Sequence, residues 1–308
     1  MVANSEKGSF FENNSQEKKD ILEPVEKLLN FAKDLSTSLN ADGLPIMIPK
    51  ENFDDCYRID IKKFSDVYCK EKIEKDIAAV QEKENTFKKL EKINEEKIKE
   101  ALSYRKSPDQ LLDIDEKMTK GSVFEIFKTS LFNKFLKEDF LVLRTSRYDD
   151  IKNGVDNMIL EKNGKNVICA IDDVTQTKLS TYFEEKKKEI LHKNLELNGV
   201  KIKYGVYFEK DRNGQRVLKK GPLENIPLFY LPLTQDYLKE GLNNFIPSLN
   251  EYSDYEKKLM KYFLEAFMLQ IRMMELESYK NDEFLKKISI VKTTVRGWGD
   301  KIRSINLK

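Results

Sequence analysis

Histidine, tryptophan and cysteine are scarce in this chain, and their scarcity narrows the kinds of site that it can hold. The 308 residues include one histidine, one tryptophan and three cysteines, Cys56, Cys69 and Cys169. The cysteines are odd in number and show neither a CxxC pair nor another metal-type spacing, so we expect reduced thiols and no zinc site. Cys169 lies inside an apolar run, and we interpret it as a small buried hydrophobic residue. We assign no catalytic role to His192.

Long apolar runs and an excess of one charge are also missing. No run approaches the roughly 18 apolar residues of a membrane span, and the first twenty residues lack the apolar centre of a secretory signal. Lysine and arginine number 55 and aspartate and glutamate 53, a net charge of +2. The protein as a whole therefore has no large excess of positive charge that would attract nucleic acid or an anionic membrane. A nucleic-acid site has to be a local patch. We expect a cytoplasmic protein that does not contact a membrane.

The chain is long enough for one large domain or two modest ones. We expect an N-terminal helical region over 1–110, an α/β core over 111–232 and a C-terminal helical segment over 233–308. Within the first region, residues 62–106 contain neither glycine nor proline and predict one long charged helix. This helix either packs on one neighbour, such as a hairpin partner at 18–38, or mediates self-association.

The coiled-coil interpretation of that long helix depends on its apolar spacing. A 4-3-7 spacing suits a coiled-coil seam, and it is shown by Ile73, Ile77, Val80 and Phe87. Glu84 and Glu91 then occupy seam positions, so a strict heptad fails. At the other end of the chain, residues 251–279 are apolar almost all round, which predicts a helix in a core or in a partner interface. Both helices are candidate surfaces for a protein partner or a homo-oligomer.

The core shows a distinct order of elements. Residues 119–208 predict a helix, a buried strand, a hairpin of two strands around "KNGK", a second helix and a further strand. A crossover helix favours parallel pairing of the strands that it joins, while the hairpin is antiparallel. The predicted fold is therefore α/β (α+β), a mixed-sheet core of αβββαβ order flanked by N-terminal and C-terminal helices. The prolines of "IPLFYLPL" limit that later strand to a sheet edge or a strand end.

Acidic residues stand at both ends of the apolar hairpin. Asp156 opens its first strand, and Asp172 and Asp173 close its second. Because side chains alternate along a strand, Asp173 shares a face with Thr175, while Asp172 faces the other way. Asp149 and Asp150, in the turn just before Asp156, are further candidates for metal binding.

This order, with its acids, resembles the PD-(D/E)xK nuclease-like superfamily of restriction and repair endonucleases. Gly154-Val155-Asp156 fits the acid at the start of the second strand, Asp172-Asp173-Val174 fits the acid near the end of the third, and Glu125 fits the glutamate of the first helix. The resemblance implies that Asp173 lies in the site and that Thr175 replaces the lysine of the motif. Lys178 beyond the strand, or Lys186 on the next helix, would then supply the displaced positive charge.

Carboxylates at facing strand ends have a chemistry of their own. They suit Mg²⁺ or Mn²⁺, hard cations that prefer oxygen ligands and that activate water near a phosphate. We therefore predict metal binding by Asp156, Asp173 and Glu125, and a metal-dependent nuclease in which Lys178 or Lys186 assists. The alternatives are a catalytically degenerate nuclease-like domain that binds a macromolecule, and a helical scaffold that recruits a protein partner.

Overall fold

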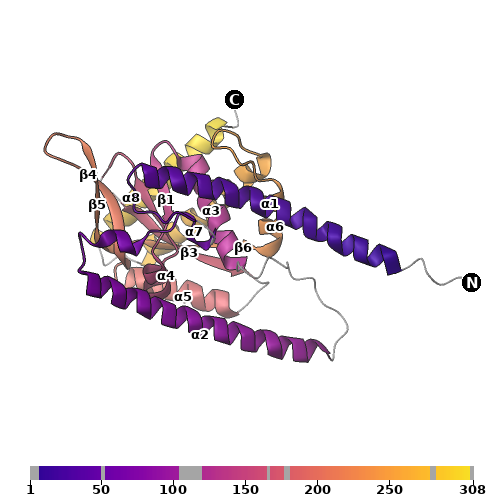
Figure 1. The fold of residues 1–308 in the computed structure, drawn as a ribbon. Coiled ribbons are helices and arrows are strands. Elements are labelled where there is room, and N and C mark those ends of the chain that lie inside the picture. The colour runs from indigo at the N-terminus through magenta and orange to yellow at the C-terminus, as the bar shows by residue number, and fades with distance from the viewer. Residues whose placement is uncertain are drawn as a thin grey trace, which may run out of the picture.

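The computed structural model describes residues 7–49, 53–103, 120–164, 167–176, 181–277 and 282–305. Its chain order, drawn in Figure 1, mixes helices and strands as the sequence predicts, and the α+β fold class is confirmed. The helices are α1 Lys7–Ala41, α2 Lys70–Ser103, α3 Lys120–Leu136, α4 Arg147–Asn153, α5 Thr181–Leu195, α6 Gln235–Asn243, α7 Asp254–Glu277 and α8 Asp282–Ile305, with short 3-10 turns η1 Phe53–Asp55 and η2 Ile61–Phe64. The strands are β1 Phe140–Arg144, β2 Asn157–Glu161, β3 Val167–Gln176, β4 Val200–Lys210, β5 Arg216–Ile226 and β6 Leu228–Thr234.

The central sheet has the strand order β1-β2-β3-β6. The predicted hairpin is confirmed, since β2 and β3 pair antiparallel with Asn157 opposite Ile171. The parallel pairing of β3 with β4 that the crossover helix α5 predicts is wrong, because β3 pairs in parallel with β6. The Asn213-Gly214 turn reverses the chain after β4, so β4 pairs with β5 in a separate two-stranded sheet. β6 is the edge strand that its prolines predict.

The long charged helix begins later than its composition predicts. Asp60 accepts a hydrogen bond from the backbone N–H of Lys62 and starts the 3-10 turn η2, and α2 itself begins only at Lys70. α2 packs against α4, whereas α1 packs against α3 and α6, and the two helices lie on opposite sides of the core in Figure 1. They do not form a helical hairpin. Self-association through α2 stays a prediction. Phe87, one of its seam residues, is exposed, as a contact with a second copy would require.

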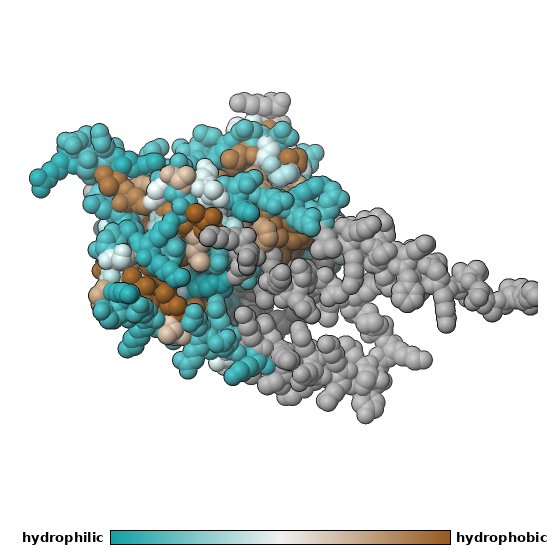
Figure 2. All heavy atoms as spheres, in the orientation of Figure 1, coloured by the Kyte–Doolittle hydropathy of each residue, from teal (hydrophilic) through white to brown (hydrophobic). Residues whose placement is uncertain are grey.

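The hydrophobic core draws on each of the three regions that the sequence predicts. One cluster of buried side chains includes Leu28 of α1, Phe127 of α3 and Trp298 of α8, so residues from all three predicted regions share a core. The apolar face of α7 contacts α8, β6 and α3 within this cluster. Leu269 and Leu276 of the same helix are exposed, and a partner interface through α7 stays a prediction. The face seen in Figure 2 is mostly hydrophilic, with separate hydrophobic patches. No helix in the described ranges is long and apolar enough to cross a membrane.

Both edges of the central sheet are closed by side-chain amides. On β1, the Asn133 amide accepts a hydrogen bond from the N–H of Val142 at 2.9 Å and donates to its carbonyl at 2.8 Å. On β6, Asn194 bonds both backbone groups of Leu228 at 2.8 and 2.7 Å, and Gln270 bonds those of Tyr230 at 3.0 and 2.9 Å. Each amide therefore takes the place of one residue of a neighbouring strand.

The backbone of residues 57–59 completes the β1 edge. The N–H of Ile59 donates to the carbonyl of Arg144 at 3.1 Å, and the N–H of Arg144 donates to the carbonyl of Tyr57 at 3.0 Å. These bonds form a short parallel bridge between the N-terminal region and β1. They also place the side chain of Arg58 beside the end of β1, where the acidic residues meet.

Candidate metal centre

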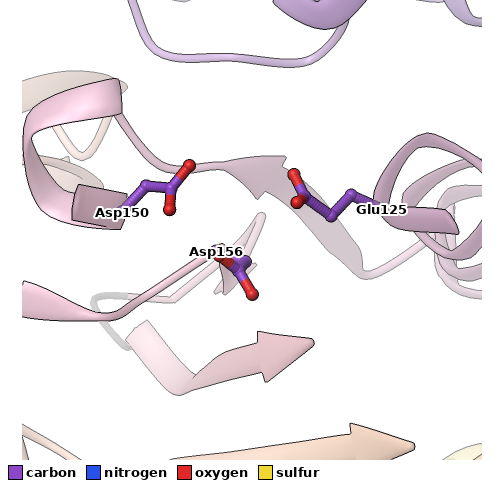
Figure 3. Close-up of side chains that lie close together, drawn as sticks. All are labelled: Glu125, Asp150 and Asp156. Atoms are coloured by element: carbon purple, nitrogen blue, oxygen red, sulfur yellow. The ribbon is translucent and has the colours of Figure 1, made fainter. Parts of the chain in front are cut away.

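Three carboxylates meet where β1 ends and β2 begins. Glu125 comes from α3, Asp150 from α4 and Asp156 from the residue before β2, and Figure 3 shows them converging. One oxygen of each lies within 4.8 Å of one oxygen of each of the others. Glu125 and Asp156 are two of the three metal ligands that the sequence predicts. The third acid of this group is Asp150, which the sequence marks as a further candidate.

The turn around α4 positions two of the acids. The Ser146 side chain accepts a hydrogen bond from the N–H of Asp149 and begins the helix, and Gly154 ends it in a left-handed conformation with φ of 62°. The chain then turns back, and Asp156 lies beside β3, the strand that pairs with β2 in the hairpin. Its carboxylate accepts a hydrogen bond from the backbone N–H of Asp173 at 2.5 Å. The helix cap and the hairpin register together fix Asp150 and Asp156 near each other.

Asp149, unlike its neighbour Asp150, binds backbone groups of β4. Its carboxylate accepts hydrogen bonds from the backbone N–H groups of Lys203 at 2.6 Å and Tyr204 at 3.0 Å. Burial raises the pKa of Asp149, and these hydrogen bonds oppose the shift. Asp149 therefore joins α4 to β4 and does not belong to the acidic group.

Two buried arginines face the acidic group. Arg144 of β1 pairs with Glu125, and Arg58 approaches Glu125 at 3.4 Å and Asp150 at 3.1 Å. Burial opposes ionisation of Glu125, but the guanidinium groups of Arg144 and Arg58 outweigh it and lower the pKa of this carboxyl. Glu125 is thus held as a carboxylate. The sequence contains no local signal for Arg58, which lies 67 positions before Glu125.

Asp156 is the acid whose charge is compensated least. Burial, together with repulsion from Glu125 and Asp150, raises its pKa well above the ordinary value, and the ammonium of Lys128 opposes this only in part. A carboxyl group with a raised pKa among other acids is the situation that a divalent cation relieves, since the ion offsets the repulsion. The donor set consists of oxygens alone, which suits Mg²⁺ or Mn²⁺. The residues present therefore fit the metal that the sequence predicts.

A lysine adjoins the acids, but it is not one of those predicted. Lys128 lies on α3, three residues after Glu125, and its ammonium contacts the carboxylate of Asp173. Burial lowers the pKa of Lys128 to about 7, although Asp156 and Glu125 favour its charged form. The spacing from Glu125 was a usable signal, because positions three apart share one side of a helix. From the sequence alone, Glu125 and Lys128 resemble an exposed ion pair on one side of a helix. Only the burial of Lys128 in the structure distinguishes them from such a pair.

Asp173 faces Lys128 rather than the acidic group. Its second carboxylate oxygen accepts a hydrogen bond from the Asn157 amide at 3.0 Å, and the Asn157 amide oxygen accepts one from the Thr129 hydroxyl at 2.6 Å. The backbone N–H of Asp173 donates to the carboxylate of Asp156. Asp173 therefore holds both Lys128 and Asp156 in place.

The predicted lysines have other positions. Lys186 of α5 pairs with Asp172 at 2.7 Å, and although burial opposes its charge, Asp172 raises the pKa of this lysine. Strand alternation correctly separates Asp172 from Asp173, and Lys186 lies with Asp172 on the α5 side. Lys178 lies outside the described residues, as does the Thr175 side chain.

Similarity to known proteins adds no assignment to this site. The chain matches no family model, no curated protein and no solved structure.

Proposed function

We propose that this protein is a divalent-metal-dependent phosphodiesterase that cleaves nucleic acid. The metal, Mg²⁺ or Mn²⁺, would be held by Glu125, Asp150 and Asp156. The observation that carries the proposal is the convergence of these carboxylates within 4.8 Å beside Lys128, a buried lysine with a pKa of about 7. The resemblance of the element order and its acids to the PD-(D/E)xK nuclease-like superfamily supports a phosphodiester substrate.

The residues of the site take complementary roles in this proposal. A bound Mg²⁺ supplies positive charge against a phosphate oxygen and makes nearby water more acidic. Lys128 is the general base, because an amine with a pKa of about 7 is partly neutral near physiological pH and can accept the proton of the attacking water. Asp173 and Asn157 position Lys128. Once protonated, the ammonium of Lys128 stabilises negative charge on the phosphate.

A second function is favoured by the two arginines. Arg58 and Arg144 already compensate Glu125, and Arg58 also pairs with Asp150. A buried ion-pair network of this kind can specify a fold without binding a metal. The alternative is therefore a degenerate nuclease-like domain that binds a macromolecule, through the sheet domain or through its helices, without cleaving it.

Metal binding and cleavage separate the two functions. Calorimetric titration with Mn²⁺ should give saturable binding to the wild-type protein and none to Asp156→Asn. Single- and double-stranded DNA and RNA should be cleaved in Mg²⁺ or Mn²⁺ by the wild type, and Asp156→Asn should lose at least a hundredfold in rate. Asp236→Asn removes an exposed acid of α6 and should leave binding and cleavage unchanged.

Each failure has a distinct meaning. Binding of Mn²⁺ without cleavage of any substrate would favour the degenerate domain. Absence of Mn²⁺ binding by the wild type would refute the metal site itself. Equal cleavage by wild type and Asp156→Asn would place the activity elsewhere and refute the assignment of this residue.

A further inference from the structure

A stripe of side chains on α7 faces away from the core of the molecule. It consists of Tyr262, Glu265, Leu269, Arg272 and Leu276, of which Tyr262 is half-buried and the others are exposed. Their alternating spacing of three and four residues keeps them on one side of the helix, as in a coiled-coil seam. Leu269 is 60% exposed and Leu276 is 78% exposed. The stripe therefore offers two large apolar side chains to a second helix.

The chemistry of this stripe is symmetric about Leu269. Glu265 lies four residues before Leu269, and Arg272 lies three residues after it. Tyr262 and Leu276 lie seven residues to either side. When a second α7 runs antiparallel, with its Leu269 opposite the first, Glu265 of each copy faces Arg272 of the other. The same pairing places Leu276 of each copy against Tyr262 of the other, so acid meets base and apolar meets apolar.

Other arrangements of two α7 helices bring like charges together. A parallel pair in register would place Glu265 against Glu265 and Arg272 against Arg272. An antiparallel pair centred on Arg272 would again oppose two guanidinium groups. Juxtaposed like charges destabilise a helix contact, so they select against these arrangements. The charge pattern thus favours the antiparallel pair centred on Leu269.

The charged groups of the stripe are available for a second copy. Glu265 lies 4.0 Å from Lys261 of its own helix, which is too long for a hydrogen bond, and both side chains are well exposed. Arg272 forms no ion pair with another described residue. In the antiparallel pair, Lys261 also lies opposite Glu277 of the other copy, because the two are eight residues before and after Leu269. Pairing therefore adds charge contacts without breaking a strong one.

An aromatic pair receives Leu276 of the second copy. The ring of Tyr262 contacts that of Tyr237 on α6, with 6.3 Å between the centroids. The hydroxyl of Tyr262 donates to the carbonyl of Pro232 at 3.1 Å, which fixes the ring. Tyr237 is 43% exposed. A leucine side chain that packs there covers apolar surface on both rings.

We propose that two copies of this chain associate through α7, antiparallel, with a two-fold axis at Leu269. Each copy presents the same self-complementary stripe, as a two-fold interface requires. From Tyr262 to Leu276 the helix rises about 21 Å, so the interface is small and its dissociation constant is expected in the micromolar range. This inference does not depend on the proposed nuclease function.

Charge reversal tests the pairing by sedimentation equilibrium. The wild type should show a concentration-dependent equilibrium between monomer and dimer. Glu265→Arg opposes two cations and Arg272→Glu opposes two anions, and symmetry repeats each change twice in the dimer. Each variant should raise the dissociation constant at least tenfold. Lys286→Glu changes an exposed residue of α8 by the same charge as Arg272→Glu and should associate like the wild type.

Mixing the two reversed variants is the sharper test. In a mixed dimer, the Glu265→Arg copy carries two cations on its stripe and the Arg272→Glu copy carries two anions, so both pairs are complementary again. An equimolar mixture should therefore dimerise within about threefold of the wild-type affinity. The double variant Glu265→Arg/Arg272→Glu should likewise recover self-association. Circular dichroism checks that each variant is folded.

A cross-link locates the two-fold axis. Cys56 and Cys169 are buried and Cys69 is exposed, so the experiment uses a Cys69→Ser background. Leu269→Cys places a thiol opposite its own copy, and mild oxidation should give a covalent dimer on a non-reducing gel. Thr293→Cys, at an exposed position of α8, should give much less covalent dimer under the same conditions.

Three results would overturn the proposal. One is a wild type that stays monomeric at hundreds of micromolar, which would leave the stripe to a different protein. Another is a dimer that neither charge reversal weakens, which would place the interface on another surface. The third is a mixture of the two reversed variants that associates no better than either variant alone, which would refute the facing of Glu265 and Arg272.

Discussion

Replacing Lys128 with methionine tests the central electrostatic claim. The folded protein holds the pKa of this lysine near 7, against an ordinary value of 10.5. Between these two values the unfolded chain keeps the lysine proton while the folded chain releases it, so unfolding takes up a proton. Stability contributed by this group therefore rises with pH, by about 1.4 kcal/mol for each pH unit in that window. Below the folded pKa, the cost of burying the ammonium is fully present.

The assay is urea unfolding of the wild type and Lys128→Met at several pH values. From about pH 7.5 to about pH 9.5, the wild type should gain about 3 kcal/mol in free energy of unfolding relative to the variant. Methionine has a similar length and no titrating group, so the difference between the two proteins reports Lys128 together with its charge interaction with Asp156. A difference that stays constant within about 0.5 kcal/mol over this range would show that Lys128 remains charged, and its role as a base would fall with it.

Two further substitutions test the packing around the site. Asn133→Ala removes both hydrogen bonds to Val142 and leaves its backbone N–H and carbonyl unpaired, so the free energy of unfolding should fall by about 2–4 kcal/mol in urea; a loss under about 1 kcal/mol would contradict the closure of this edge by an amide. Lys134→Met breaks a fully buried pair with Glu256 and should cost about 3–5 kcal/mol by the same measurement, because the carboxylate is left buried. Adding Glu256→Gln should restore part of that loss, and a double variant no more stable than the single one would contradict the pairing.

The sequence predicts the parts of this structure that depend on short-range patterns. The Asn-Gly turn and the apolar runs determine the β2–β3 hairpin, and alternation along β3 assigns Asp172 and Asp173 to opposite faces. The positions of Glu125 and Asp156 follow from the same element order. These features need only the period of a strand or a helix and the chemistry of a turn.

The remaining features depend on contacts between distant segments. Arg58 reaches the acids because residues 57–59 bridge β1, and nothing near Arg58 in the chain indicates this bridge. The strand beside β3 could not be predicted either, since β4 and β6 are both apolar enough to pair with it. Lys128 and Lys186 are both lysines on amphipathic helices, and their environments differ through burial and through the acid that each one meets.

The closed edges of the central sheet restrict how this protein can meet other chains. An open edge strand is where a peptide can join a sheet by backbone hydrogen bonds, and where unwanted strand pairing begins. Here Val142, Leu228 and Tyr230 already have their outward backbone groups occupied by amides, and Pro232 has no N–H and accepts from the Tyr262 hydroxyl at 3.1 Å. A partner that approached these positions would have to displace side chains anchored in α3, α5 and α7. The sheet is thus sealed against strand exchange at these residues, and recognition there has to proceed through side chains.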